Sequence, residues 1–211
     1  MHSAYKENAL LLQSNHFTPV VHPTARIAST AVISGDVEIG PNCSIGHGAV
    51  LLAEGGPIRI GANCVIMDTA VIRGVPKQVM RLGDHVLVGP RACLIGCSVE
   101  DEVFIATGAS VFNGAVLGRG SEVRINAVVH LRTVLEAGAT VPIGWVAVGA
   151  PAQILPASDH EGIWAIQKPL DFPKYVLNTE RPAPGESMME NVMPRYARSL
   201  RRMHADDRAV S

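Results

Sequence analysis

An aliphatic residue recurs every six positions along most of the chain, and this repeat limits the folds that the chain can adopt. A strand repeats every two residues and a helix every 3.6, so neither element explains a period of six. A coil with three short, flat faces does, because each face then turns one large side chain into a narrow core. The repeat therefore predicts an all-β fold, a left-handed parallel β-helix of hexapeptide units. The aliphatic positions are Val21, Ile27, Ile33, Ile39, Ile45, Leu51, Ile60, Ile66, Ile72, Leu82, Val88, Leu94, Val99, Ile105, Val111, Leu117, Val123, Val129, Leu135 and Val141.

Small residues occupy most of the positions that lie four residues after these aliphatics. They are Ala25, Ala31, Cys43, Ala49, Cys64, Ala70, Ala92, Ala109, Ala115, Ala127 and Ala139. One large and one small side chain at each corner would fill a core too narrow for rings, which agrees with an aromatic content of only 4%. Cys43 and Cys64 are therefore expected to be buried core residues.

The repeat divides the chain into three predicted parts. Residues 1–20 are expected to be a lead-in, residues 21–156 the β-helix, and residues 157–211 a helical extension that packs on the β-helix. Insertions interrupt the repeat near residues 53–57 and 74–80. We expect these insertions to be loops that leave the coil and can carry functional residues.

The extension loses the six-residue period and contains helix signals instead. Ser158 and Glu161 have the spacing of a capping box and predict a short helix over residues 162–168. Residues 169–185 contain four prolines and are predicted to be extended chain. Apolar residues at helical spacing predict a second helix over residues 186–204, with an apolar stripe that packs on the coil.

Composition and charge limit the classes of partner, the cellular location and the cofactors that we expect for this chain. The formal net charge of −1 gives no electrostatic reason to expect nucleic acid or an anionic membrane as a partner. The N-terminal segment has only a short leucine run, and no stretch approaches the length of a membrane span. The four cysteines do not form a metal-binding set. We therefore expect a reduced, cytoplasmic protein without a bound cofactor.

A coil of this kind exposes the flat faces of parallel sheets, and such faces promote association. We expect a homotrimer around an axis parallel to the coil, with any functional site at the subunit interfaces.

Four segments carry a likeness to a known family: VVHPTARIASTAVISGDVEIGPNCSIGHGAVL, PIRIGANCVIMDTAVI, RLGDHVLVGPRACLIGCSVEDEVFIATGASVFNGAVLG and VPIGWVAVGAPAQIL. Through them the chain resembles the γ-class carbonic anhydrases, which are grouped with the hexapeptide-repeat transferases. The likeness includes the single five-residue step that follows Leu94 and leads to Val99. It implies the same β-helix and the same trimeric assembly.

The resemblance also implies where a metal site would lie. In that family, three histidines shared across the subunit interface bind zinc or iron, and the corresponding positions here are Arg73, Pro90 and Ile95. The side chains of proline and isoleucine have no donor atom, and arginine stays cationic. The family's arginine and glutamine beside the metal correspond to Leu52 and Met67. We therefore expect no metal at this site and no zinc-dependent hydration of carbon dioxide.

Carboxylates remain at Glu54 and Asp68, so two roles for the altered site stay open. Arg73 can pair with one of them or lie near Arg91 of a neighbour, and an ion pair here would stabilise the trimer of a degenerate, structural homologue. Alternatively, Arg73 and apolar neighbours form a pocket for a small carboxylate or acyl compound. Glu54 or Asp68 could then act as the general base of a metal-independent lyase or hydrolase.

A third hypothesis is a hexapeptide acyltransferase that uses an acyl-coenzyme A. Such enzymes often use a histidine as a base near the subunit interface, and His130 or His47 are the candidates in this chain.

Overall fold

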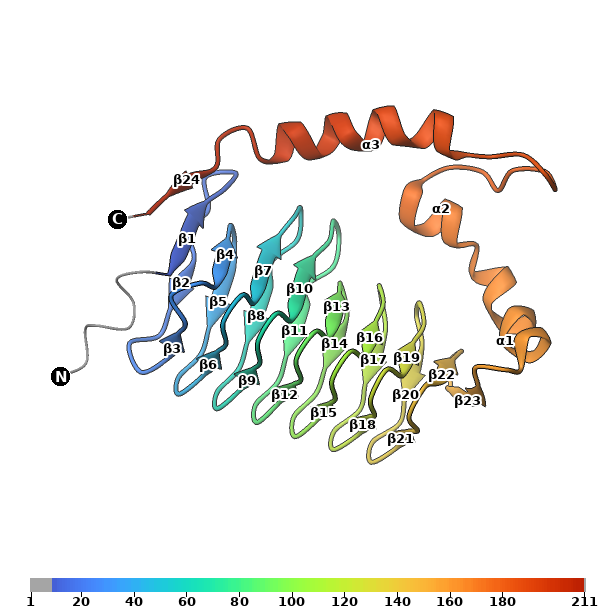
Figure 1. Cartoon of the computed structure of the whole chain (residues 1–211), viewed down its shortest axis with the longest axis horizontal. Coiled ribbons are helices and arrows are strands. Elements are labelled where there is room, and N and C mark those ends of the chain that lie inside the picture. Colours follow the sequence, from blue (N-terminus) through green and yellow to red (C-terminus); the bar gives the residue numbers. More distant parts are fainter. Residues whose placement is uncertain (1–8, 211) are drawn as a thin grey trace.

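The computed structural model describes residues 9–210, which wind into a parallel β-helix with helices after it (Figure 1). Three flat sheets form the sides of the coil, and up to residue 148 successive strands of the chain fall in different sheets. The predicted fold class is confirmed. No helix of the described residues is long and apolar enough to cross a membrane.

The first sheet has ten strands and reaches both ends of the coil. In spatial order they are β23 (Gln153–Pro156), β22 (Trp145–Val148), β19 (Val128–Val129), β16 (Ser110–Val111), β13 (Cys93–Ile95), β10 (Val71–Gly74), β7 (Val50–Ala53), β4 (Val32–Ser34), β1 (Leu10–Gln13) and β24 (Arg208–Ala209).

The second and third sheets have seven parallel strands each. The second sheet contains β2 (Val20–Val21), β5 (Val37–Ile39), β8 (Ile58–Ile60), β11 (Met80–Leu82), β14 (Ser98–Val99), β17 (Val116–Leu117) and β20 (Val134–Leu135). The third contains β21 (Thr140–Val141), β18 (Glu122–Val123), β15 (Phe104–Ile105), β12 (Leu87–Val88), β9 (Val65–Ile66), β6 (Ser44–Ile45) and β3 (Arg26–Ile27).

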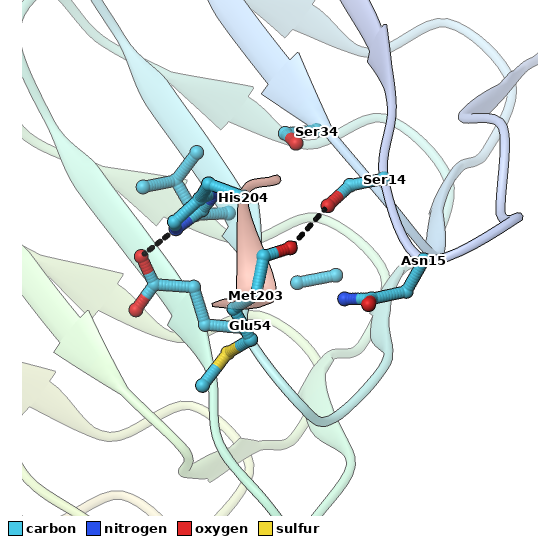
Figure 2. A pocket seen from close by; sticks show the side chains of 8 residues that line it. Ser14, Asn15, Ser34, Glu54, Met203 and His204 are labelled. Atoms are coloured by element: carbon cyan, nitrogen blue, oxygen red, sulfur yellow. Dashed lines mark hydrogen bonds and ion pairs between the residues drawn. The ribbon is translucent and has the colours of Figure 1, made fainter. Parts of the chain in front are cut away.

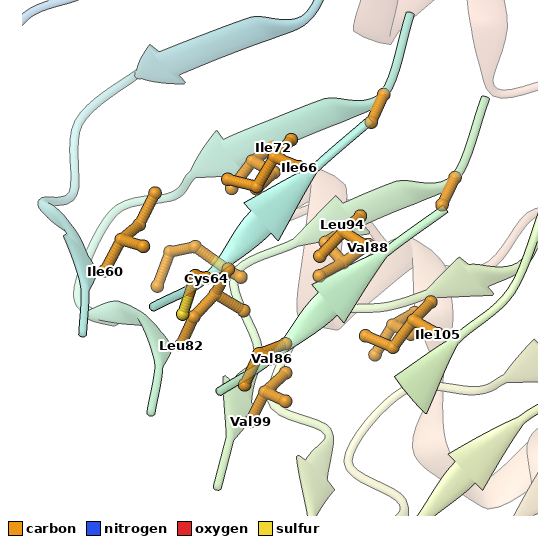
Figure 3. Packing of buried hydrophobic residues seen from close by; sticks show 14 of the residues in the cluster. Ile60, Cys64, Ile66, Ile72, Leu82, Val86, Val88, Leu94, Val99 and Ile105 are labelled. Atoms are coloured by element: carbon orange, nitrogen blue, oxygen red, sulfur yellow. The ribbon is translucent and has the colours of Figure 1, made fainter. Parts of the chain in front are cut away.

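The core is a stack of aliphatic side chains that lie in register from coil to coil (Figure 3). In the first sheet, Ile72 lies between Leu51 and Leu94, and all three are fully buried. The small positions, Cys43 and Cys64 among them, are buried as well, except for Ala139, which is partly buried. The core therefore has the predicted alternation of large and small residues.

The outer faces of the three sheets differ in polarity. On the second sheet, Arg59 forms ion pairs with Asp36 at 2.8 Å and Glu38 at 3.3 Å. On the third sheet, by contrast, Val65 and Met67 are 39% and 37% exposed. The first sheet presents half-buried apolar residues on its outer side, among them Val50, Leu52, Val71 and Ile95. Exposed or half-buried apolar residues thus lie on the first and third sheets, although the third also carries the ion pair of Arg124 with Glu122.

The C-terminal extension returns along the coil toward the N-terminal strand (Figure 1). Its elements are α1 (His160–Gln167), the 3-10 helix η1 (Lys168–Leu170), α2 (Phe172–Leu177) and α3 (Met189–Met203). After α3, strand β24 pairs antiparallel with β1, so that Leu12 lies opposite Ala209. On α3, Val192 is buried while Met189, Met193 and Tyr196 stay exposed. The apolar stripe of this helix is therefore only partly covered.

Two local predictions in the extension are wrong. The N-cap of α1 is Asp159 rather than Ser158, because the Asp159 carboxylate accepts the Gly162 N–H at 3.0 Å. Residues 169–185 are not extended throughout, since they contain most of η1 and all of α2. Pro169 and Pro173 lie in the first turns of these helices, where a missing N–H leaves no bond unmade.

The core stack predicts that two Val→Ala substitutions in the second sheet lower the free energy of unfolding by very different amounts. Val99 is fully buried, whereas Val134 is 39% exposed. Val99→Ala should lower the free energy of unfolding by about 2 kcal/mol, because it removes buried methyl groups and leaves a cavity. Val134→Ala should change it by less than about 0.5 kcal/mol. Urea denaturation measures both, and equal losses would contradict the assignment of inward and outward positions.

Candidate functional site

Arg73 lies on the outer face of the first sheet, in strand β10. Its neighbour Ile72 points into the core, so the alternation of a strand turns Arg73 outward. The flanking strands place Leu52 and Ile95 directly beside it, because both are register partners of Arg73. Three of the predicted site residues therefore form one row, with a cation between two aliphatic side chains.

Glu54 follows β7 and forms an ion pair with Arg73 through its Oε2 atom. The Glu54 side chain is only 12% exposed and that of Arg73 is 33% exposed. Arg73 thus has an acidic partner within its own chain. The Arg73 nitrogen in this pair is Nη2. Within residues 9–210, it is the one Arg73 nitrogen that has a side-chain acceptor.

His204 contacts the other oxygen of the same carboxylate (Figure 2). Its Nε2 lies 3.2 Å from Glu54 Oε1, and its Nδ1 lies 2.8 Å from Asp207 Oδ2. Burial alone would lower the pKa of His204, but the hydrogen bonds that its protonated ring donates to Asp207 and Glu54 raise it above its ordinary value. Arg73, Glu54, His204 and Asp207 therefore form a chain of alternating charge when His204 is protonated.

Sequence patterns do not predict His204 or Asp207 as site residues. Both belong to the extension, and His204 lies 150 positions from Glu54. The repeat does not continue into this part of the chain. His204 and Asp207 reach the site because α3 returns along the coil. No local sequence pattern specifies this path.

A small pocket opens beside this carboxylate, between the coil and the end of α3 (Figure 2). It is a tight crevice in which a water-sized molecule does not fit. Inside it, the Ser14 hydroxyl donates to the Met203 carbonyl at 3.4 Å. The lining residues are Ser14, Asn15, Ser34, Leu52, Ala53, Glu54, Met203 and His204.

Asp68, Met67, Pro90 and Arg91 lie elsewhere, at the corner between the third and first sheets. The Asp68 carboxylate accepts the His47 N–H at 2.6 Å, and its carbonyl accepts the Arg91 N–H at 3.2 Å. Asp68 is therefore held by the turns of adjacent coils. No ion pair joins it to Arg73 among residues 9–210, so one chain by itself does not bring the two groups together.

Residues that commonly bind metals do not cluster in this region. Across residues 9–210, no group of three histidine, cysteine, aspartate or glutamate side chains is placed to hold a metal ion. His47 is exposed, and its Nδ1 lies 2.9 Å from the Thr30 hydroxyl.

His130 lies in the C-terminal half of the first sheet, just after β19. Its ring is half-buried beside Phe112, with 6.3 Å between the ring centroids. Burial lowers the pKa of His130, so the imidazole is neutral at neutral pH. Its Nδ1 is buried and has no hydrogen-bond partner within residues 9–210. A neutral imidazole with an unoccupied nitrogen can accept a proton.

Comparisons with known proteins support the resemblance. The family model for the bacterial transferase hexapeptide (six repeats) matches residues 18–53. A γ carbonic anhydrase of Arabidopsis thaliana, named as mitochondrial, is 33% identical over 143 residues, which are 65% of this chain and 50% of that protein. The carnitine operon protein CaiE of Escherichia coli is 29% identical over 147 residues, covering 69% of this chain and 72% of CaiE.

A solved structure agrees with the fold. It is a Bacillus cereus protein assigned as an acetyltransferase, with 26% identity and a TM-score of 0.55 over 77% of this chain and 93% of that one. The chain spans about half the length of the γ carbonic anhydrases it matches first.

The contacts of His204 predict how stability depends on pH. Because its pKa is raised in the folded state, its contribution is fully present below the ordinary pKa of 6.5 and is lost as pH rises through the raised value. The free energy of unfolding should therefore fall by about 1 kcal/mol or less over this interval, since the side chain is partly exposed. Urea denaturation across the pH range measures this loss.

His204→Gln should remove that part of the pH dependence, whereas the control His160→Gln, at an exposed position of α1, should keep it. An unchanged pH profile in His204→Gln would contradict the assignment.

Proposed function

We propose that this chain is a trimer that binds a small carboxylate or acyl compound at its subunit interfaces. The proposal starts from the match of residues 18–53 to the hexapeptide family model and from the similarity to γ carbonic anhydrases. In this proposal the chain lacks the family's metal site. The observation that carries the proposal is the ion pair of Arg73 with Glu54, set between Leu52 and Ile95 on an outer sheet face.

The donor set argues for a metal-independent site. A zinc or iron ion needs neutral imidazoles or anionic side chains around it. The three positions that correspond to the family's histidines hold Arg73, Pro90 and Ile95, a cation and two side chains without donor atoms. These residues do not fit a divalent cation, so no step of the proposed function involves one.

The polarity of the outer faces supports a trimer. The first and third sheets present apolar residues, while the second presents Arg59 and its acidic partners. Packing the first sheet of one subunit against the third-sheet corner of the next would cover Met67, which is 37% exposed. The same packing would bring Pro90 and Arg91 of one subunit toward Arg73 of its neighbour.

The geometry around Arg73 suits an anion with a short apolar part. A guanidinium has five N–H donors in a planar fork, and Glu54 uses one side of it. The free donors can hold a second carboxylate, and Leu52 and Ile95 offer apolar contact to its carbon chain.

Binding fits this site better than general-base catalysis by either candidate carboxylate. Both oxygens of Glu54 are engaged, one by Arg73 and one by His204. One oxygen of Asp68 accepts the His47 N–H of the adjacent coil. A base must be free to accept a proton from its substrate. We therefore assign Glu54 the role of orienting Arg73.

Acyl transfer is a second candidate, favoured by one specific observation. His130 is a neutral imidazole whose Nδ1 has no partner among residues 9–210. It could remove a proton from an acceptor that attacks an acyl-coenzyme A. The relative assigned as an acetyltransferase gives this alternative some support.

Calorimetric titration with acetate, propionate and butyrate tests the carboxylate site. We expect saturable binding by the wild type and a loss of at least tenfold in affinity for Arg73→Gln, because the substitution removes the charged donor. Arg59→Gln, on the charged face of the second sheet, is the matched control and should bind normally. Equal affinity in Arg73→Gln and the wild type would contradict the proposal. Binding of acetyl-coenzyme A that depends on His130 would favour acyl transfer instead.

Light scattering coupled to size-exclusion chromatography tests the trimer. The wild type should have three times the mass of the chain, and Ile95→Glu should dissociate it, because a charge would be buried at the interface. Val134→Glu, on the outer face of the second sheet, should leave the mass unchanged. A monomeric wild type, or a trimer that tolerates Ile95→Glu, would contradict the proposed interface.

A further inference from the structure

The end of the chain is fastened to the coil beside the Arg73 site. We call residues 189–210, from α3 to the end of the described chain, the C-terminal strap. Its last strand, β24, extends the first sheet by pairing with β1, and the Val210 N–H donates to the Leu11 carbonyl at 2.8 Å. His204 makes the contact between the strap and Glu54. The strap therefore docks on the residue that orients Arg73.

We infer that docking of the C-terminal strap and binding of a carboxylate at Arg73 are coupled through Glu54, with His204 as a positioning residue. This inference rests on the proposed function, because it concerns the same site.

The coupling follows from how the Glu54 carboxylate is shared. With the strap docked, Oε1 faces His204 and Oε2 faces Arg73, so the guanidinium is paired on one side only. Without His204, both oxygens can turn to the guanidinium and form a bidentate pair. Arg73 is then more fully neutralised and its donors are occupied. A second carboxylate therefore binds more weakly when the strap is released.

Thermodynamic linkage makes the effect reciprocal, so a bound carboxylate should also stabilise the docked strap. The strength of the coupling depends on the charge of His204, since a protonated His204 draws more of the Glu54 charge away from Arg73 than a neutral one does. Carboxylate affinity should therefore be higher below the pKa of His204 than above it.

Few charged groups face His204. Glu54 approaches it from the loop after β7, Asp207 from its own segment, and Arg73 of β10 reaches it through Glu54. The remaining residues that line the pocket are uncharged: Ser14, Asn15, Ser34, Leu52, Ala53 and Met203. The charge state near Arg73 is thus set by the strap residues His204 and Asp207 together with Glu54.

Two measurements on the full-length protein test the coupling, with acetate as the probe. In calorimetry, His204→Gln should weaken acetate binding about fivefold or more and remove its dependence on pH. Arg202→Gln, an exposed change on α3, should do neither. In hydrogen exchange, acetate should slow the amides of residues 208–210 in the wild type.

The results separate this inference from the proposed function. If the wild type binds acetate but His204→Gln binds it equally well with the same pH profile, the coupling is wrong while the binding site stands. If the wild type binds no carboxylate, the proposed function fails. Hydrogen exchange of the amides of residues 208–210 then tests by itself whether Glu54 holds the strap in place. Glu54→Gln should then speed exchange at residues 208–210, and unchanged exchange would refute the link as well.

Discussion

The register of the inward stack is the constraint on which the rest of this structure depends. Most strands of the coil are only two or three residues long, too short to be stable alone. They persist because each buried aliphatic lies on the equivalent residue of the next coil, as Ile72 lies between Leu51 and Leu94. A strand that turns one residue inward must turn the next outward. The stack therefore also fixes the outward row that contains Leu52, Arg73 and Ile95.

This relation explains why the fold and part of the site could be predicted from the sequence. The six-residue period is a local signal, and it specifies which side chains are buried in every coil. The resemblance implies that Arg73 and Ile95 stand at positions of the family's metal-binding histidines. The strand register places the two residues side by side. Glu54 could be named because the resemblance implies a carboxylate at its position.

The remaining features depend on tertiary contacts that no local pattern specifies. The contact of His204 with Glu54 requires α3 to return along the whole coil, and the extension has no repeat that would fix this path. Proline content predicted extended chain where Pro169 and Pro173 instead begin helices. The sequence also allows Asp68 to pair with Arg73, but the Asp68 carboxylate accepts the His47 N–H of the adjacent coil instead.

We propose that the ion pair of Arg73 with Glu54 stands where the resemblance to γ carbonic anhydrases implies a metal site. Elemental analysis of the purified protein, combined with its rate of carbon dioxide hydration, tests this claim most directly. Neither zinc nor iron should be present in stoichiometric amount, and carbon dioxide should be hydrated at the uncatalysed rate. One zinc or iron per subunit, with hydration above that rate, would contradict it and would show that other residues supply the ligands.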